Sequence, residues 1–159
     1  MAKEIERKFL VNELPFAPKT YPHVPIVQGY LALEPEGQEV RLRRKGELYY
    51  LTVKSQGTLV REEYEVELSQ EQFDALWPGT IGRRLEKDRY LFEAFELDIY
   101  KGNLEGLRVA EIEFADAQEA QSFQSPDWLG REVTHINFLK NRNLLQFQGW
   151  AVIQKELGL

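Results

Sequence analysis

The chain has 159 residues, the size of one domain, and its hydrophobic share of 43% and charged share of 29% are typical of a globular protein. No apolar run approaches the roughly 20 residues that a membrane helix requires, and the charged N-terminus does not resemble a signal peptide, so we expect a cytoplasmic protein. The net charge of −6 argues against a nucleic-acid-binding surface, but a small anion can still bind in a locally basic pocket. Because there is no cysteine and there are only two histidines, any metal must be held mainly by carboxylates.

Eight strands are predicted in chain order, many of them separated by Gly-containing turns. Eight strands of this length are enough to close a barrel. They cover residues 4–11, 27–33, 39–44, 49–55, 61–68, 84–92, 94–100 and 107–114.

Helices are predicted after the fifth and eighth strands and near the C-terminus. Ser69 and Asp116 are each suited to cap a short helix that ends near the next proline. A third helix is predicted over residues 137–148. Residues 149–159 form an extension of unknown role, which can pack back on the sheet or mediate self-association. The sequence leaves both open, so we expect a monomer or a homodimer.

The charged residues of the predicted strands fall on one face of each strand, because successive side chains point to opposite faces. Glu6 and Lys8 share a face in the first strand, and Arg41 and Arg43 flank the opposite-facing Leu42 in the third. The same alternation holds for Glu63, Glu65 and Glu67, for Lys87 and Arg89, for Glu96 and Asp98, and for Glu111 and Glu113.

Two arrangements fit this alternation. In the ordinary one, the apolar face packs on a core and the charged face meets water. In the other, the apolar faces meet helices on the outside and the charged faces line a polar interior. That interior requires a ligand, because burying unpaired charges is costly. Alternation alone does not decide between them.

A polar interior would have a use for charges of both signs. Its basic side chains would donate N–H groups to phosphate oxygens. Its carboxylates would repel such a ligand unless a hard divalent cation, most plausibly Mg²⁺ or Mn²⁺, lay between them. The basic candidates are Lys8, Arg41, Arg43, Lys54, Lys87 and Arg89.

An ordered series of motifs over roughly residues 2 to 145 resembles the CYTH superfamily, the triphosphate tunnel metalloenzymes, and in particular its short bacterial members. The first motif has the ExExK form of the family signature. The series is Glu4-Ile5-Glu6-Arg7-Lys8, Gln28-Gly29-Tyr30-Leu31, Arg41-Leu42-Arg43, Leu51-Thr52-Val53-Lys54-Ser55, Glu63-Tyr64-Glu65, Glu86-Lys87-Asp88-Arg89-Tyr90, Glu96-Leu97-Asp98 and Glu111-Ile112-Glu113-Phe114.

The resemblance implies a mainly β (α+β) fold: a closed eight-stranded antiparallel β-barrel with its charged residues inside and a few flanking helices. One such tunnel domain is expected over residues 1–148. The six basic candidates are expected to hold a triphosphate, together with Lys140, which here lacks the family's frequent tyrosine neighbour. The expected metal ligands are Glu4, Glu6, Glu63, Glu65, Glu111 and Glu113.

The resemblance also implies catalytic residues. Tyr30 resembles a tyrosine that is paired with the signature lysine, and we expect Lys8, Tyr30 and Lys87 to be catalytic. A lysine among other cations has a lowered pKa and can help to activate water, although a second metal can do the same. The structural alternative for Tyr30 is a packing residue whose hydroxyl is satisfied.

Inorganic triphosphate is the expected substrate, split to pyrophosphate and phosphate, because we find no aromatic clamp for a base or a thiazole. Thiamine triphosphatase and nucleoside triphosphatase are the alternatives, and class IV adenylate cyclase is disfavoured. A non-catalytic polyphosphate-binding module is the alternative of another class, but the many carboxylates argue against it. We expect no nucleic-acid or membrane partner.

Overall fold

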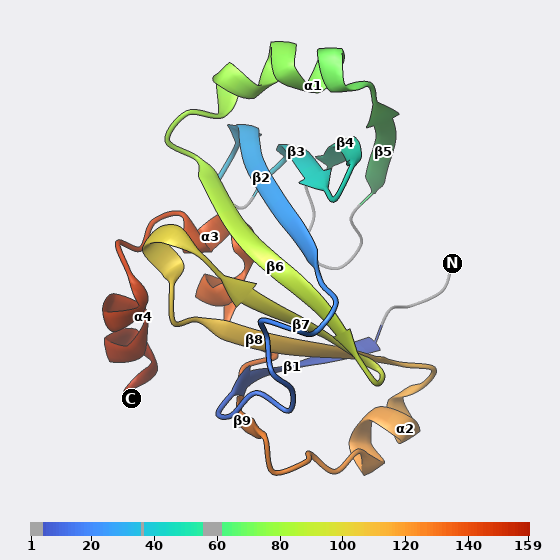
Figure 1. The fold of residues 1–159 in the computed structure, drawn as a ribbon, viewed down its shortest axis with the longest axis vertical. Coiled ribbons are helices and arrows are strands. Elements are labelled where there is room, and N and C mark those ends of the chain that lie inside the picture. The colour runs from blue at the N-terminus through green and yellow to red at the C-terminus, as the bar shows by residue number, and fades with distance from the viewer. Residues whose placement is uncertain (1–4, 36, 56–61) are drawn as a thin grey trace.

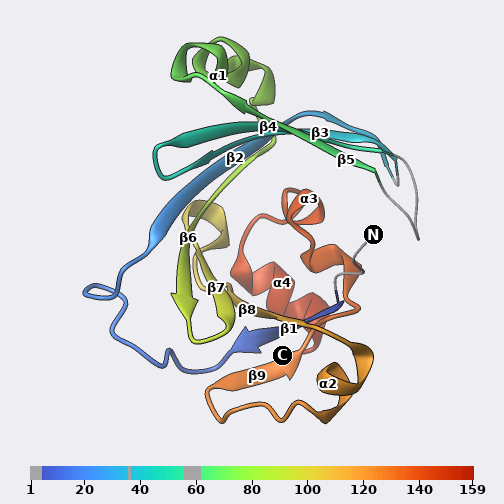
Figure 2. The same ribbon diagram turned by 90° about the vertical axis from the view of Figure 1, so that its right-hand side faces the viewer.

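Nine antiparallel strands form a single, strongly curved sheet in the computed structural model, which describes residues 5–35, 37–55 and 62–159 (Figure 1 and Figure 2). The strand order across the sheet is β5-β4-β3-β2-β6-β7-β8-β1-β9. The strands are β1 (Ile5–Val11), β2 (Val24–Leu33), β3 (Glu39–Lys45), β4 (Leu48–Lys54), β5 (Glu63–Leu68), β6 (Arg84–Phe92), β7 (Phe95–Tyr100), β8 (Arg108–Phe114) and β9 (Leu129–Glu132).

The described strands do not close into the eight-stranded barrel expected from the sequence. A ninth strand, β9, pairs with the second half of β1, and the sheet order ends at β5 and β9. The pairing continues past β9, where the amide of Val133 donates to the carbonyl of Lys8 at 2.8 Å. The edge of β1 that closure would require is therefore already occupied along this stretch.

Both predicted helix caps are confirmed. Ser69 forms a reciprocal capping box with Gln72 at the start of α1 (Gln70–Leu76), which is followed by the 3₁₀ turn η1 (Trp77–Thr80). Asp116 accepts a hydrogen bond from the amide of Glu119 at the start of α2 (Ala117–Ser122). Both helices lie on the outer side of the curved sheet (Figure 2). No helix among the described residues is long and apolar enough to cross a membrane.

The prediction of a single helix over residues 137–148 was wrong. The chain forms a 3₁₀ turn, η3 (Asn137–Leu139), and a short helix, α3 (Asn141–Leu144), on either side of Lys140. Lys140 has an extended backbone (φ −64°, ψ 142°), which interrupts the helical hydrogen bonds. A further 3₁₀ turn, η2 (Gly102–Leu104), precedes β8.

Apolar residues cover both faces of the sheet. On the concave face, Leu10, Leu85 and Val109 pack against Leu144 and Ile153 of the C-terminal helices. These helices lie within the curve of the sheet, as Figure 2 shows. On the convex face, a second cluster of core residues packs on α2. It includes Phe9, Ala110, Phe114, Ala120 and Phe123.

The C-terminal helix α4 (Trp150–Leu157) packs back on the sheet, one of the two arrangements that the sequence left open. Ile153 is fully buried, and the guanidinium of Arg131 donates to the carbonyl of Leu157. The ring of Trp150 lies so close to Gly106 that a Cβ at Gly106 would be 2.5 Å from it. Gly106 thus provides the space in which α4 begins.

We expect Gly106→Ala to destabilise the fold by about 2 kcal/mol, because φ is +107° at this position and the new methyl would displace Trp150. Gly102→Ala is the matched control: it also has positive φ (+62°), but no atom lies within 4 Å, so we expect a cost of about 1 kcal/mol. Urea unfolding measures both. Equal costs would contradict a role for Gly106 in seating Trp150.

Candidate active site

Cross-strand register brings the predicted site residues of β1 to β8 to one face of the sheet. Lys8 lies opposite Glu111, and Arg41 lies opposite both Tyr30 and Thr52. Directly opposed residues share a face. This face is the concave one, because it also carries the residues that pack on the C-terminal helices. The predicted residues on it are Glu6, Lys8, Tyr30, Arg41, Arg43, Lys54, Glu63, Glu65, Lys87, Arg89, Glu111 and Glu113.

A buried ion cluster lies near the middle of this face. Lys87 is 2% exposed, and its Nζ lies 2.8 Å from Oδ2 of Asp98. Arg89 donates to both oxygens of the same carboxylate, at 2.8 and 3.0 Å. Glu96 pairs with Arg89 at 3.1 Å but is half-exposed. Asp98 therefore orients two cations at once by charge-assisted hydrogen bonds.

The cluster shifts the pKa of each partner. Burial would raise the pKa of Asp98, but the charges and hydrogen bonds of Lys87 and Arg89 outweigh it and lower this pKa to about 2. Burial lowers the pKa of Lys87 to about 8, and the positive charges of Arg89 and Arg43 act in the same direction, against the attraction of Asp98. Lys87 can thus exchange a proton near neutral pH.

A second group of polar residues extends the basic face onto β2 and β3. Nε of Arg43 donates to Oε1 of Gln28 at 2.9 Å, and Nη2 of Arg41 lies 3.4 Å from the hydroxyl of Thr52. Thr52 in turn donates to Glu65 at 2.8 Å. Burial lowers the pKa of Arg43 to about 10, helped by the neighbouring charge of Arg41. Two cations are thereby held close together on one face.

Two N–H groups of this second group are buried without an acceptor: Nε of Arg41 and Nε2 of Gln28. Buried donors are nearly always hydrogen-bonded, and leaving one unpaired costs about 1–3 kcal/mol. Each lies on the concave face, and both are donors. These two positions therefore fit a ligand that offers acceptor atoms.

Tyr30 is buried beside these arginines. It is 2% exposed, and burial raises its pKa despite the opposing charges of Arg41 and Arg43. Among the described contacts, none joins its hydroxyl to Lys8 or Lys87. The aromatic ring that lies against Lys87 is that of Tyr100, 5.4 Å from Nζ.

Carboxylates crowd together where β1 meets β8. The pKa of Glu6 is raised to about 8, mainly by a hydrogen bond with Glu111, and the like charges of Glu111 and Glu113 add to the shift. Lys8 opposes it. A divalent cation would relieve this repulsion, so these residues fit a hard metal ion. In the described part of the chain, however, no three or more potential ligands converge into a metal cluster, and Glu4 lies outside that part.

Two other predicted metal ligands, Glu63 and Glu65, lie far from this group in the order of the sheet. They are on β5, at one edge of the sheet, with five strands between β5 and β8. Both are exposed, and Glu65 accepts the hydrogen bond from Thr52. The structure thus divides the predicted metal ligands into two sets, and the predicted basic residues other than Lys8 lie on the strands between them.

The remaining predicted cations differ in their surroundings. Lys8 is half-buried, and Lys54 pairs with Glu39 at 3.8 Å. Lys140, expected to cap the site, is exposed. Arg142, two residues further on, is instead the side chain that reaches Glu39. The sequence analysis had not selected it.

Several site residues were not predicted as such. Asp98 had a signal, since it alternates with apolar neighbours on the same face as Arg89, but the expected roles went to cations and glutamates. Gln28 was part of a matched motif and received no role. Arg142 lies in a segment without strand alternation, so no pattern in the sequence pointed to it.

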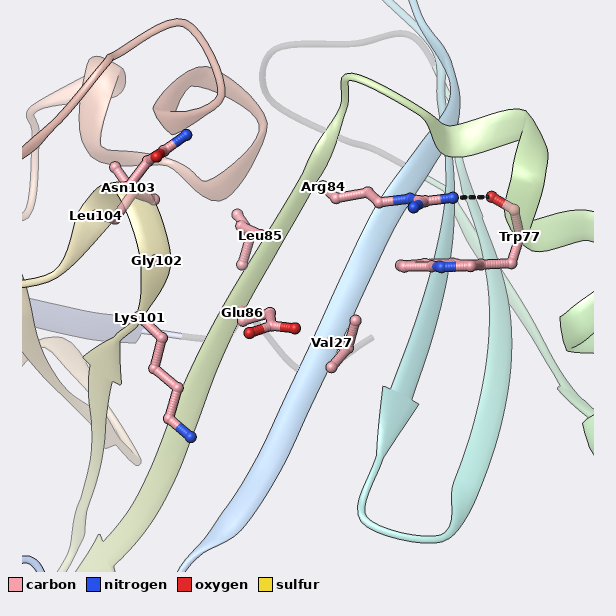
Figure 3. A pocket seen from close by; sticks show the side chains of 9 residues that line it. All are labelled: Val27, Trp77, Arg84, Leu85, Glu86, Lys101, Gly102, Asn103 and Leu104. Carbon is pink, nitrogen blue, oxygen red and sulfur yellow. Dashed lines mark hydrogen bonds between the residues drawn. The ribbon is translucent and has the colours of Figure 1, made fainter.

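A pocket of about 340 Å³ lies beside β2 and β6, as Figure 3 shows. Val27 and Glu86 line it, and their register places them on the convex face. Arg84 stacks on the ring of Trp77 there and donates to the carbonyl of Trp77 at 2.8 Å. No predicted site residue lines this pocket, so it is separate from the concave site.

We expect Asp98→Asn to destabilise the protein by about 3 kcal/mol at pH 7, because it leaves Lys87 and Arg89 buried beside a neutral group. The folded-state pKa of Asp98 lies below its unfolded value, so its stabilisation is present above about pH 4 and is lost as pH falls through about 2. Urea unfolding from pH 7 down to pH 2 should show the difference between wild type and variant shrinking.

Glu96→Gln is the matched control. Glu96 also pairs with Arg89, but it is half-exposed, so we expect a cost under about 1 kcal/mol. A difference between wild type and Asp98→Asn that stays constant down to pH 2 would contradict the assigned ion cluster.

The chain is similar to known proteins over nearly its whole length. A family model described as the CYTH domain matches residues 2–145. An inorganic triphosphatase from Nitrosomonas europaea is 44% identical over 146 residues, covering 89% of this chain and 95% of that protein. One from Acetivibrio thermocellus is 37% identical over 155 residues, covering 92% and 95%. The crystal structure of the inorganic triphosphatase NE1496 has a TM-score of 0.78 at 42% identity, covering 94% of this chain and 99% of that one.

Proposed function

This chain belongs to the CYTH family, and we propose that it is an inorganic triphosphatase, which splits triphosphate into pyrophosphate and phosphate on the concave face of its sheet. Two relatives, 44% and 37% identical over most of the chain, are named inorganic triphosphatase. We further propose that the curved sheet forms the wall of a triphosphate tunnel.

The observation that carries this proposal is the surplus of buried hydrogen-bond donors. Nε of Arg41 and Nε2 of Gln28 lack acceptors. Lys87 and Arg89 both pair with Asp98, and Arg89 also pairs with the half-exposed Glu96. A linear triphosphate is rich in oxygen acceptors and carries several negative charges. It would satisfy the unpaired donors and neutralise the cations together.

Six basic residues of the concave face are proposed to bind the substrate, four of them from β3 and β6 near the middle of the sheet. Arg41 and Arg43 present planar forks to the phosphate oxygens, and Gln28 fixes the orientation of Arg43. Asp98 fixes Lys87 and Arg89 in the same way on the neighbouring strands. Such positioning is most of what phosphoryl transfer requires from a protein. The proposed substrate ligands are Lys8, Arg41, Arg43, Lys54, Lys87 and Arg89, with Lys140 as a more distant candidate.

A divalent cation, Mg²⁺ or Mn²⁺, is proposed as the cofactor. Glu6, Glu111 and Glu113 would hold it, with Glu4 completing the set, because a cation would relieve their mutual repulsion. When bound, it would neutralise phosphate charge and orient the attacking water. Glu63 and Glu65 lie at the opposite edge of the open sheet, so closing the sheet into a tunnel would bring them toward this group.

Three residues are proposed to take part in the chemistry. Lys87 has a pKa of about 8, which suits a group that gains or releases a proton near neutral pH. Lys8 lies directly opposite Glu111, one of the proposed metal ligands, and so places a cation beside the proposed metal site. Tyr30 stays protonated, since burial raises its pKa, and its hydroxyl would donate to a phosphate oxygen.

Phosphate release tests the proposal directly. Triphosphate, thiamine triphosphate, ATP and pyrophosphate are each incubated with Mg²⁺, with Mn²⁺ or with chelator. We expect metal-dependent release that is fastest from triphosphate. We expect Glu6→Ala and Lys87→Ala each to lower kcat/KM by about 100-fold or more, because each removes a charge that the transition state needs.

Arg84→Ala is the matched control, since Arg84 lies in the separate outer pocket and should leave kcat/KM within about twofold. Faster release from an organic triphosphate would replace the substrate and keep the site. Tight triphosphate binding without release from any compound would instead indicate a non-catalytic polyphosphate-binding module.

A further inference from the structure

We propose that Thr134 is a positioning residue for Lys8: its hydroxyl fixes the backbone from which the Lys8 side chain reaches the concave site. The inference rests on the proposed function, because it concerns how a substrate ligand of that site is oriented. It assigns a role to a residue that directly follows β9 and lies outside the motif series.

Thr134 continues the hydrogen bonding of β1 beyond the end of β9. The amide of Val133 donates to the carbonyl of Lys8 at 2.8 Å, and in a regular antiparallel pair the amide of Lys8 would donate back to the carbonyl of Val133. That carbonyl instead accepts from the amide of Ile136 at 3.1 Å. The amide of Lys8 donates to the hydroxyl of Thr134 at 3.0 Å, so a side chain replaces the strand's own acceptor.

The hydroxyl of Thr134 has a separate acceptor for its proton. It donates to Oε2 of Glu132 at 2.6 Å, while the carbonyl of Lys8 lies further away, at 3.5 Å. A hydroxyl carries one proton and two acceptor lone pairs. With the proton directed to Glu132, the lone pairs remain to accept the amide of Lys8.

Glu132 is in turn fixed by the residue that precedes Lys8. Nε and Nη2 of Arg7 donate to the two oxygens of Glu132 at 2.8 and 2.7 Å, a planar bidentate pair. Nη1 of Arg7 donates to the carbonyl of Ala120 at 2.8 Å, and the guanidinium lies 5.3 Å from the ring centre of Phe9. The hydrogen bond from Arg7 lowers the pKa of Glu132 to about 2, so this carboxylate remains an acceptor at neutral pH.

These contacts form a ring that begins and ends on neighbouring residues of β1. It passes from the side chain of Arg7 through two further side chains to the amide of Lys8. The side chain of Arg7 lies on the convex face and that of Lys8 on the concave face, because successive strand residues alternate. Fixing the peptide between them therefore fixes the direction in which Lys8 leaves the strand, toward Glu111.

The restraint should act on Lys8 more than on the fold. β1 is paired with β8 from Ile5 to Leu10, and Thr134 takes no part in those pairs. Lys8 has a long side chain, so a small rotation of its backbone moves the ammonium group much further. A displacement of about 1 Å in a positioned group can cost about 100-fold in rate.

Thr134→Val keeps the shape of the side chain and removes the hydroxyl. We expect it to lower kcat/KM for triphosphate about tenfold, because Lys8 is no longer held in place. Thr134→Ser retains the hydroxyl and should stay within about threefold of wild type. Steady-state phosphate release measures both variants.

Hydrogen exchange tests the contact itself, without any substrate. The amide of Lys8 should exchange about tenfold faster in Thr134→Val than in wild type, because it loses its acceptor. The amide of Phe9 is the internal control: by strand alternation it faces β8, and its exchange should not change.

The decisive experiment is a double-mutant cycle between Thr134 and Lys8. If Thr134 acts through the Lys8 side chain, Thr134→Val should lower kcat/KM by less than about twofold in a Lys8→Met background, against about tenfold in wild type. Calorimetry with chelator gives the Kd for triphosphate without turnover and should show the same coupling.

Thr80→Val is the matched control. Thr80 is fully buried in η1, and its hydroxyl likewise donates to one group, the carbonyl of Trp77 at 2.7 Å, and accepts from another, Nε of Arg84 at 2.8 Å. We expect this variant to keep kcat/KM within about twofold of wild type even where its Tm falls.

Equal losses from Thr134→Val with and without Lys8 overturn the inference, because Thr134 would then act through the fold. Unchanged exchange of the Lys8 amide overturns it as well. If wild type releases no phosphate, the proposed function fails, and the exchange rates and the Kd values of the same cycle still decide on Thr134.

Discussion

The concentration of positive charge on one buried face is the constraint on which the rest of this structure depends. Lys87 and Arg89 lie on β6 and Arg41 and Arg43 on β3, with β2 between the two strands. Burial lowers the pKa values of Lys87 and Arg43, and the positive charges of their neighbours add to this. Asp98 compensates part of this charge in the free protein, through three short contacts. The positive charge that Asp98 does not neutralise, together with the unpaired donors of Arg41 and Gln28, favours the binding of an anion on this face. The same cations that favour anion binding thus destabilise the free fold, and Asp98 reduces this cost by neutralising part of their charge.

Charge is also ordered along the curve of the sheet. Glutamates lie on β5 at one edge and on β8 and β1 toward the other, and the cations other than Lys8 lie on the strands between them. A chain of phosphates bound to the cations would therefore have carboxylates on both flanks, where a metal ion can bridge carboxylate and phosphate. Backbone register alone produces this order, because directly opposed residues across eight strands keep the charged positions on one side.

The sequence predicted the strands and their charged face well, because alternation has a strict period and register transmits it from strand to strand. It did not predict β9, a four-residue strand whose burial pattern carries no full alternation. Nor did it predict the break at Lys140, which lies between two stretches of otherwise helical character. Arg142 was missed for a related reason. Its contacts are with backbone carbonyls more than 100 residues earlier in the chain, and local patterns contain no information on such contacts.

The position of β1 in the sheet has a consequence for the order in which the protein folds. β1 is the first strand to be synthesised, but its neighbours are β8 and β9, about 100 residues later. The hairpins β2-β3, β3-β4 and β6-β7 need only local contacts, whereas β1 must wait until most of the chain exists. During synthesis the strands that carry Arg41, Arg43, Lys87 and Arg89 can therefore pair before Glu6 and Lys8 of β1 join the sheet. Until β1 inserts, the edge of β8 is exposed, and this nascent edge is where misassembly between chains would begin.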